Sequence, residues 1–361
     1  MKRHIILIVG LLLLSVLVMG LMFTFSEPDL SAHGGFRRKY ISDPILSADT
    51  IDLEFDSWYI AGQTRTTLFL GNIVAPAQAV SINVTTGDTS HFAITLSNPE
   101  RIGLHEVKLR IDSPRIFLYD GMAPVVFQGD LEEKVVRRSR AAVPFFLDVE
   151  PMSRDRFAFR SILPGNVADL MYADNKELMT CGVLTRQVDG LLCTAGMMYF
   201  DPYWDKLIYV YFYRNEIMVL DSCLRVERTF RTIDTVTRAK ISVASMSDQS
   251  RTVFSSPPVL VNRQSSVFED VLVVNSKILA DNDEVSRLKN GCDFDFYDIG
   301  KGRYLGTIYL PHFDRQEARF HRFMNNRLAV LYERQLVIYT LTENITCNQE
   351  ICRTPVKNSR Q

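Results

Sequence analysis

The sequence lacks the short motifs by which many enzymes are recognised. It has no GxGxxG or GxxxxGK[ST] phosphate-binding loop, no GxSxG nucleophile turn and no HExxH metal-binding helix. It also has no CxxC pair, and its cysteine spacing fits no zinc site. The classes of enzyme that need these motifs therefore receive no support.

The sequence also lacks an excess of charge of either sign. Lys plus Arg number 41 and Asp plus Glu number 42, which gives a formal net charge of −1. A near-neutral chain has no general attraction to nucleic acid or to anionic lipid, so we expect no nucleic-acid partner. Its two basic runs, 37–39 and 137–140, are typical of solvated faces.

Long apolar runs are absent except at the N-terminus. Residues 5–25 carry no charge, and as a helix they would reach roughly 31 Å, enough to cross a bilayer. A cleaved signal peptide is the alternative, with small residues at Val18 and Gly20 or at Thr24 and Ser26 before the cut. The run exceeds the ~7–15 residues of a signal core, which favours a retained anchor.

The flanking charges predict how this anchor is oriented. Lys2 and Arg3 lie on the short side, so residues 1–4 form a cytoplasmic tail. The rest of a single-pass protein of the cytoplasmic membrane then lies on the extracytoplasmic, periplasmic side. Residues 26–48 are polar and rich in turn formers, and they are expected to be a tether.

Six cysteines lie in the exported part, and an even number outside the cytoplasm favours disulfides. Cys347 and Cys352 are expected to close a small loop in the C-terminal tail, 346–361. Cys181 with Cys193 is a weaker candidate pair. Cys223 and Cys292 are compatible with buried free thiols.

No segment beyond the N-terminus has the length and period of an amphipathic helix, and 281–291 offers one helical turn at most. Residues 49–345 instead read as short strands around polar turns. Six strand–turn–strand units recur at intervals of roughly 45–60 residues, near the period of propeller blades. Their turns lie at Gly71-Asn72, Asp120-Gly121, Gly165-Asn166, Arg214-Asn215, Asn275-Ser276 and Glu333-Arg334.

Several of these strands are apolar on both faces. In 207–213, Leu207 and Tyr209 point to one face while Ile208 and Val210 point to the other. A sandwich would leave one face wet, and an α/β fold needs helices that the sequence does not provide. We therefore predict an all-β propeller, with six blades, or seven if 241–254 forms another. Thr50–Phe55 would supply the outer strand of the last blade.

The chain resembles a group of uncharacterised bacterial, membrane-anchored, propeller-like exported proteins. The resemblance rests on "DGLLCTAGMMYFDPYWDKLIYVYFYRNEIMVLDSCLRVERTFRTIDT" and on "RLAVLYERQLVIYTL", and it covers most of residues 50–341. Its motifs, 213–215 and 232–235, look structural. The resemblance implies the fold and the location but no activity.

Few residues are candidates for a site. The acidic group formed by Asp281, Asp283, Glu284, Asp293, Asp295 and Asp298 is the best candidate for structural calcium, although its spacing fails the EF-hand pattern and a solvated loop followed by an edge strand is favoured. Arg214 and Asn215 are candidates for a ligand-binding face. The favoured alternative is structural: an asparagine in a turn accepts a left-handed backbone, which would explain Asn215 without a ligand. Trp58 and Trp204 are expected in the core.

Three functions stay open, and no catalytic or cofactor-binding residue is assigned. The favoured one is a non-enzymatic scaffold that binds another envelope or membrane protein. The alternatives are a propeller that binds a small molecule or sugar, and a redox or enzyme subunit with its site in the central channel.

Overall fold

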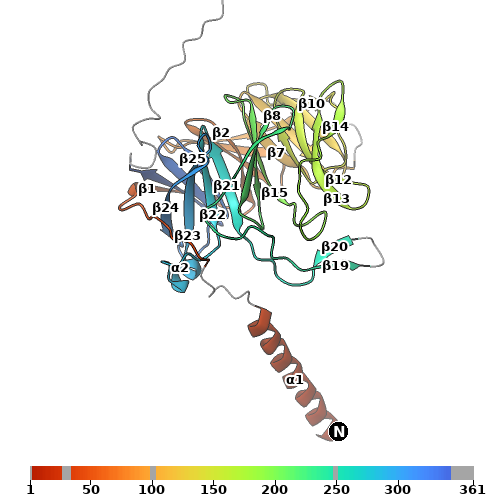
Figure 1. Cartoon of the computed structure of the whole chain (residues 1–361), viewed down its shortest axis with the longest axis vertical. Coiled ribbons are helices and arrows are strands. Elements are labelled where there is room, and N and C mark those ends of the chain that lie inside the picture. The colour runs from red at the N-terminus through yellow and green to blue at the C-terminus, as the bar shows by residue number, and fades with distance from the viewer. Residues whose placement is uncertain (1, 27–33, 98–102, 247–250, 343–361) are drawn as a thin grey trace, which may run out of the picture.

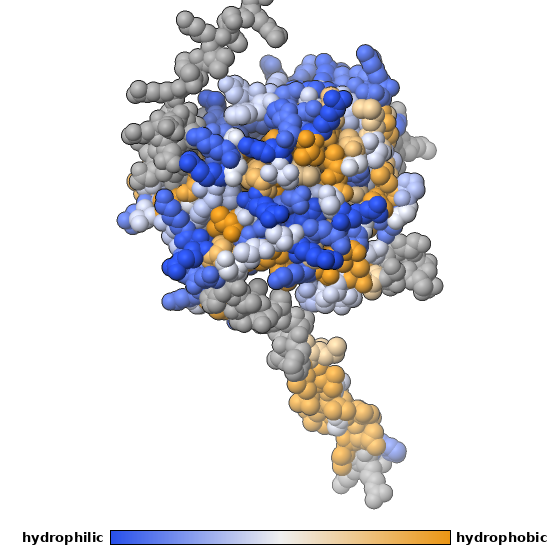
Figure 2. All heavy atoms as spheres, in the orientation of Figure 1, coloured by the Kyte–Doolittle hydropathy of each residue, from blue (hydrophilic) through white to orange (hydrophobic). Residues whose placement is uncertain are grey.

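The computed structural model describes residues 2–26, 34–97, 103–246 and 251–342. It opens with one helix, α1 (Lys2–Ser26), in which His4–Met22 is long and apolar enough to cross a membrane. A signal sequence passes the same test of length and composition. Figure 2 shows this helix as a continuous apolar rod that extends away from a domain of mixed polarity.

Almost every other element is a strand, and most strands form antiparallel arrays of four. The first two arrays are joined by a short parallel pairing into one nine-stranded sheet. The arrays comprise β2 (Trp58–Gln63), β3 (Thr67–Asn72), β4 (Gln78–Asn83) and β5 (Thr89–Ala93); β7 (Lys108–Asp112), β8 (Arg115–Asp120), β9 (Val125–Asp130) and β10 (Val135–Arg138); β11 (Asp148–Pro151), β12 (Phe157–Leu163), β13 (Val167–Ala173) and β14 (Leu178–Thr180); β15 (Gly196–Asp201), β16 (Lys206–Tyr211), β17 (Glu216–Asp221) and β18 (Val226–Arg231); β21 (Asn262–Phe268), β22 (Val271–Ser276), β23 (Gly291–Asp298) and β24 (Arg303–Pro311); and β25 (Phe320–Met324), β26 (Arg327–Leu331), β27 (Gln335–Leu341) and β1 (Ile45–Asp52).

Four smaller elements complete the described fold. The short strand β6 (Thr95–Leu96) pairs in parallel with β10, and β19 (Val243–Met246) forms a separate hairpin with β20 (Arg251–Phe254). Helix α2 (Val285–Asn290) precedes β23, where the sequence predicts one helical turn. The segment 241–254, which the sequence offers as a seventh blade, thus contributes a two-stranded hairpin. In Figure 1 this hairpin, α2 and α1 lie at the same end of the molecule.

Apolar clusters join each array to the next, and the sequence of contacts returns to its start. Phe294 and Phe296 of β23, for example, pack against Phe323 of β25 and Leu328 of β26. Corresponding clusters join β26 and β27 to β3, β3 to β8, β8 to β12, β13 to β16, and β16 to β22. Each middle strand is therefore covered on both faces by neighbouring sheets, as the double-sided apolar pattern predicts.

The sequence locates the turns well. All six expected turns fall where the second strand of an array ends, and in five arrays the third strand follows directly. In the β21–β24 array the unit predicted around Asn275-Ser276 has no strand directly after its turn. Residues 277–280 lie in a loop, and β22 pairs instead with β23, which follows α2. The outer strand of the last array comes from the N-terminal part of the chain, as expected, although β1 begins earlier, at Ile45.

Two other expectations were wrong. Residues 292–298 alternate Asp with aromatic side chains, which suggested an edge strand with a wet face. All eight residues of β23 are buried, because β22 and β24 flank the strand and its carboxylates have partners inside the protein. The expected tether, 26–48, is part of the fold from Gly34 onward, since backbone hydrogen bonds join Gly34 to Leu279 and Ile41 to Thr307.

A close approach between two arrays generates a test of the packing. Gly62 of β2 pairs in parallel with Ile111 of β7, and a Cβ at this position would overlap the carbonyl oxygen of Ile111. We expect Gly62→Ala to lower the free energy of unfolding by about 1–3 kcal/mol, because the two strands must move apart. Urea denaturation measures this change. Gly103→Ala, where a Cβ meets no atom within 4 Å, is the matched control and should change little.

Candidate functional site

A buried arginine occupies the centre of the acidic group. The Arg38 side chain is fully buried, and its Nη1 lies 2.5 Å from Asp283 Oδ2. Its Nε lies 3.1 Å from Asp295 Oδ1, and Nη2 donates to Ser276 Oγ at 2.9 Å. Asp293 Oδ2 lies 3.5 Å from Nη1. The guanidinium thus takes the place that a cation would need among these three carboxylates.

The electrostatics of this cluster follow from its burial. Burial opposes the charge on Arg38, but Asp295, Asp293 and Asp283 together raise its pKa above the usual range. Burial raises the pKa of Asp293 to about 6, although Arg38 acts in the opposite direction. Tyr40 donates its hydroxyl to Asp283 Oδ1 at 2.5 Å, and its pKa is raised by burial and by Asp293. A charged cluster of this kind is stable only while every member keeps its partner.

The rest of the predicted calcium group does not converge on one point. Asp281 Oδ1 accepts a hydrogen bond from the Gly35 amide, Asp298 caps the turn after β23 through the Lys301 amide, and Glu284 is exposed. Only Asp283, Asp293 and Asp295 come together, and the other three acids of the group lie apart from them. Arg38, which the sequence placed in a solvated run, is the counter-ion of the central three.

Arg214 and Asn215, the two residues predicted for a ligand-binding face, are buried in the turn between β16 and β17. The Arg214 side chain is fully buried, with Nε 2.8 Å from Glu216 Oε2 and Nη1 3.1 Å from the Thr185 carbonyl oxygen. Its guanidinium stacks 3.4 Å from the centre of the Tyr211 ring. Nη2 has no partner among the described residues. These contacts hold the turn together, so the surface left for a ligand is small.

Asn215 joins the two motifs that support the resemblance. Its Nδ2 donates to the Asp234 carbonyl oxygen at 2.5 Å, and its backbone amide donates to Val236 at 2.8 Å. Asp234 in turn accepts from Thr232 Oγ1. A left-handed backbone is found at Asn166 (φ 57°) but not at Asn215, so the side-chain bridge explains this residue better than turn geometry does.

The cysteines of the described chain are all free. Cys193 is buried and donates its thiol to the Asp189 carbonyl oxygen at 2.9 Å, so the expected pairing with Cys181 does not form. Cys292 is buried, as expected, and Cys223 is exposed. The predicted loop between Cys347 and Cys352 lies outside the described residues.

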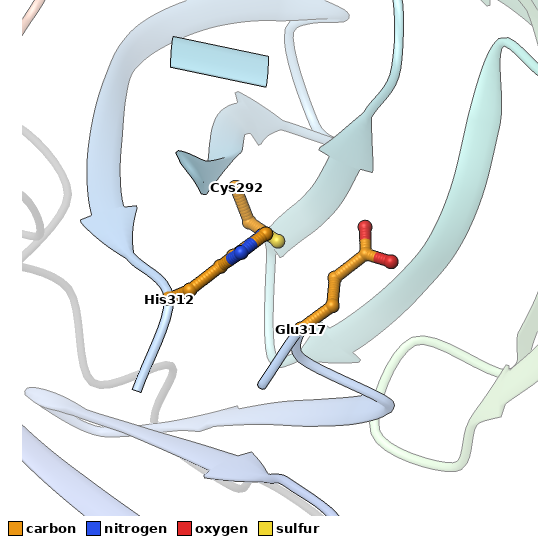
Figure 3. Close-up of side chains that lie close together, drawn as sticks. All are labelled: Cys292, His312 and Glu317. Carbon is orange, nitrogen blue, oxygen red and sulfur yellow. The ribbon is translucent and has the colours of Figure 1, made fainter. Parts of the chain in front are cut away.

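One cysteine has neighbours that resemble a metal site. The potential ligand atoms of Cys292, His312 and Glu317 lie within 4.8 Å of one another (Figure 3). However, Lys277 and Arg263 both contact Glu317 Oε1, so a metal ion would compete with two cations. Burial also raises the pKa of the Cys292 thiol and lowers that of His312, which keeps both groups uncharged. This arrangement favours an ion-paired glutamate over a metal centre.

An aromatic pair stands out on the surface. Tyr203 and Trp204, in the turn between β15 and β16, are 84% and 47% exposed, and their rings meet edge to face. Asp201 shapes this turn by accepting hydrogen bonds from both backbone amides. The expected core role holds for Trp58, which is 6% exposed, but not for Trp204.

Trp204 lines a groove of about 290 Å³ between the β15–β18 array and the β21–β24 array. We call this the aromatic groove; it is lined by Asp201, Trp204, Lys206, Ile208, Val219, Glu227, Arg228, Glu269, Asp270, Ile299 and Gly300. Both of its bases are engaged, because Lys206 pairs with Glu227 and Arg228 donates to the carbonyl oxygens of Ile299 and Gly300. Acidic residues outnumber basic ones in the lining.

Sequence reasoning missed the groove because its signal was ambiguous. Trp204 stands in "FDPYWDK", between two aspartates and after a proline, which is a turn rather than a strand context. That composition could have placed the tryptophan on the surface. The groove itself joins residues of two arrays that are distant in sequence, and only the fold brings them together.

No family model and no curated protein matches this chain. Among solved structures, it is similar to a member of the DUF4221 family from Bacteroides vulgatus, at 10% identity and a TM-score of 0.52, over 85% of this chain and 99% of that one. A streptogramin B lyase matches at 9% identity and a TM-score of 0.47, over 82% and 98%. The β-propeller domain of Cps50 (Swd1) from Myceliophteria thermophila matches at 11% and 0.41, over 82% and 100%. The fold is a β-propeller, and likeness at this level of identity shows the fold alone.

The Arg38 cluster generates a two-part test. We expect Arg38→Ala to lower the free energy of unfolding by about 3–5 kcal/mol, because three buried carboxylates lose their counter-ion. Millimolar calcium should restore part of this loss, since oxygen-rich clusters suit that ion. Thermal melts with calcium and with a chelator measure both effects. Arg37→Ala, an exposed neighbour, is the control. If calcium stabilised the unmodified protein equally, the cation site would lie elsewhere.

Proposed function

We propose that this chain is a membrane-tethered, non-enzymatic β-propeller of six blades that binds another envelope protein through the aromatic groove. The observation that carries the proposal is the exposed Tyr203–Trp204 pair at the rim of an acidic groove. Large aromatic side chains are enriched where protein surfaces meet, and their exposure in a free domain marks a candidate interface.

The retained anchor is part of the proposal. Its support is the length of α1 and the two cations that precede its apolar core, which favour an extracytoplasmic propeller. Gly34, the first described residue of the fold, follows Ser26 by eight positions, and eight residues span at most about 29 Å. The face that holds Gly34 therefore lies near the bilayer.

The aromatic groove opens on the other face. The Arg214 turn follows β16 and bonds to residues 232–236, and Thr235 donates its hydroxyl to the Gly34 carbonyl oxygen. The Trp204 turn precedes β16, so it lies at the opposite end of that strand. An anchored propeller would thus present the groove away from the membrane, where a periplasmic segment can reach it.

The chemistry of the groove indicates the kind of partner. Ile208, Val219 and Ile299 provide apolar walls, and Asp201 and Asp270 add acidic groups whose pKa values burial raises. Because the lysine and arginine of the lining are already engaged, an incoming Lys or Arg side chain would complement the remaining carboxylates. It would also lie beside the Trp204 ring, which favours a cation. We infer an extended segment with apolar and basic residues.

Site-specific photocrosslinking of the full chain in its own membrane tests this function. A benzophenone side chain at position 203 should form an adduct with one envelope protein. Asp270→Asn should lower the yield about threefold or more, because a carboxylate–cation contact is lost. Raising the salt concentration should act in the same direction.

The matched control places the same probe at Phe55. This residue is 58% exposed and lies in the connection between β1 and β2, at the membrane-facing ends of the strands. The proposal fails if both positions give the same adducts, or if the adduct at position 203 is indifferent to Asp270 and to salt.

A further inference from the structure

A layer of polar side chains lies where the first strands of the arrays meet. Contacts join β25 to β2, β2 to β7, β11 to β15, β15 to β21 and β21 to β25, so these strands surround the axis of the ring. We call a set of six polar side chains on these strands the axial layer: Gln63 on β2, Arg110 on β7, Glu150 on β11, Tyr199 on β15, Ser265 on β21 and Arg322 on β25.

Most of the axial layer is paired. Arg110 Nη2 lies 2.6 Å from Glu150 Oε1, and this ion pair joins β7 to β11 and so completes the ring. The same Glu150 oxygen accepts a hydrogen bond from the Phe200 amide at 2.9 Å. Tyr199 donates its hydroxyl to the Ser265 carbonyl oxygen at 2.5 Å. Gln63 Nε2 donates to the Phe323 carbonyl oxygen at 3.1 Å. These bonds cross from array to array.

Arg322 is the exception. Its Nη1 donates to the carbonyl oxygen of the adjacent His321 at 3.0 Å, and its guanidinium lies 5.7 Å from the centre of the Tyr199 ring. Within the described part of the chain no carboxylate lies at ion-pair distance from it. The single acid among its charged neighbours, Glu150, is already bound to Arg110. Burial, followed by repulsion from Arg110, lowers the pKa of Arg322.

Arg322 thus has one guanidinium, that of Arg110, and one carboxylate, that of Glu150, among its charged neighbours. Asp112 and Asp148 lie nearer to Glu150 and Arg110 and do not act on Arg322. Removing a cation from water without a counter-ion costs free energy, and proteins ordinarily supply a partner. A monoanion beside Arg322 would supply the acidic partner that this guanidinium lacks among the described residues. A planar carboxylate suits the two-pronged guanidinium, which can donate two parallel hydrogen bonds to it. Solvent reaches the layer, because the Arg110 side chain is 24% exposed.

We propose that the axial layer is a binding site for a small monocarboxylate, held by Arg322 and steered by Arg110. The Tyr199 ring, fixed by its bond to Ser265, provides a wall against which the guanidinium is oriented. A dianion fits less well, since Glu150 is close and adds repulsion. The site is separate from the aromatic groove, and its occupancy requires no partner protein.

Glu150 makes this site sensitive to pH. Burial raises the pKa of Glu150 to about 7, against the effect of Arg110. The groups that face it are Arg110 and Asp112 on β7, Asp148 on its own strand, Tyr199 on β15 and Arg322 on β25. As the pH falls through about 7 the glutamate takes up a proton, Arg110 loses its ionised partner, and the site becomes more positive. Carboxylate binding should therefore strengthen at lower pH.

Calorimetric titration of the purified full chain in detergent with sodium formate and sodium acetate tests the site, with sodium chloride and sodium phosphate as comparison anions. We expect saturable binding of the carboxylates, weakened about tenfold or more by Arg322→Gln because the charged hydrogen bonds are lost. Arg322→Lys, which keeps the charge but not the planar fork, should bind less well than the unmodified protein. Arg334→Gln, an exposed arginine in the turn before β27, is the matched control and should bind normally.

Glu150→Gln provides the second measurement. It should bind acetate more tightly than the unmodified protein at pH 8, and its affinity should no longer change between pH 6 and pH 8. The proposal is overturned if Arg322→Gln binds formate and acetate as the unmodified protein does, or if all four salts act alike and only through ionic strength. It is also overturned if Glu150→Gln keeps the pH dependence.

Discussion

The structure depends on one constraint, which is that short strands with two apolar faces must be covered on both sides. In β16, Leu207, Tyr209 and Tyr211 meet the neighbouring array on one side while Ile208 and Val210 meet the array on the other. When each array packs against its two neighbours in this way around an axis, both faces of every array are covered and no helix is needed. It also brings the first strands of all arrays together, so polar residues on those strands are forced into a shared, narrow space. The closed ring thus produces the axial layer as a consequence of its packing.

The same constraint explains why the N-terminal segment matters. A ring needs a last strand, and β1 provides it by pairing with β27. The chain that leads into β1 does not cross the surface freely, because Arg38 is held by Asp283, Asp293 and Asp295. The described part of this segment is thus fixed to the propeller by a buried charged cluster and by the hydrogen bonds of Gly34 and Gly35. Because the segment is fixed on one face, an anchored protein would present the opposite face, with Trp204, outward.

How much of this could be predicted from the sequence depends on whether the signal is local. Turn residues and double-sided apolar strands are local patterns, and they gave the all-β ring, its turns and its closing strand. Arg38 could not be assigned, since a basic triplet reads as solvated until the carboxylates of β23, which lie about 250 positions away, are known. The prediction that β23 is an edge strand with a wet face was wrong for the same reason, because Asp295 contacts Arg38 and Thr307 inside the protein rather than water. Residues whose partners come from distant arrays carry no signal in their own neighbourhood, and the candidate sites consist of such residues.

Three arginines show how the ring distinguishes structure from function: Arg38 and Arg214 are buried, and Arg322 is half-buried. Arg38 is surrounded by three carboxylates, and Arg214 has one carboxylate, two backbone carbonyl oxygens and the Tyr211 ring. The charge of each is balanced by at least one carboxylate that the fold itself supplies. Arg322 has a backbone carbonyl oxygen and a more distant ring, and its nearest acid belongs to Arg110. A guanidinium is expensive to bury, and its charge persists at any physiological pH. The three side chains therefore differ in which groups balance their charge, and for Arg322 the proposed carboxylate ligand is the partner that the fold does not supply.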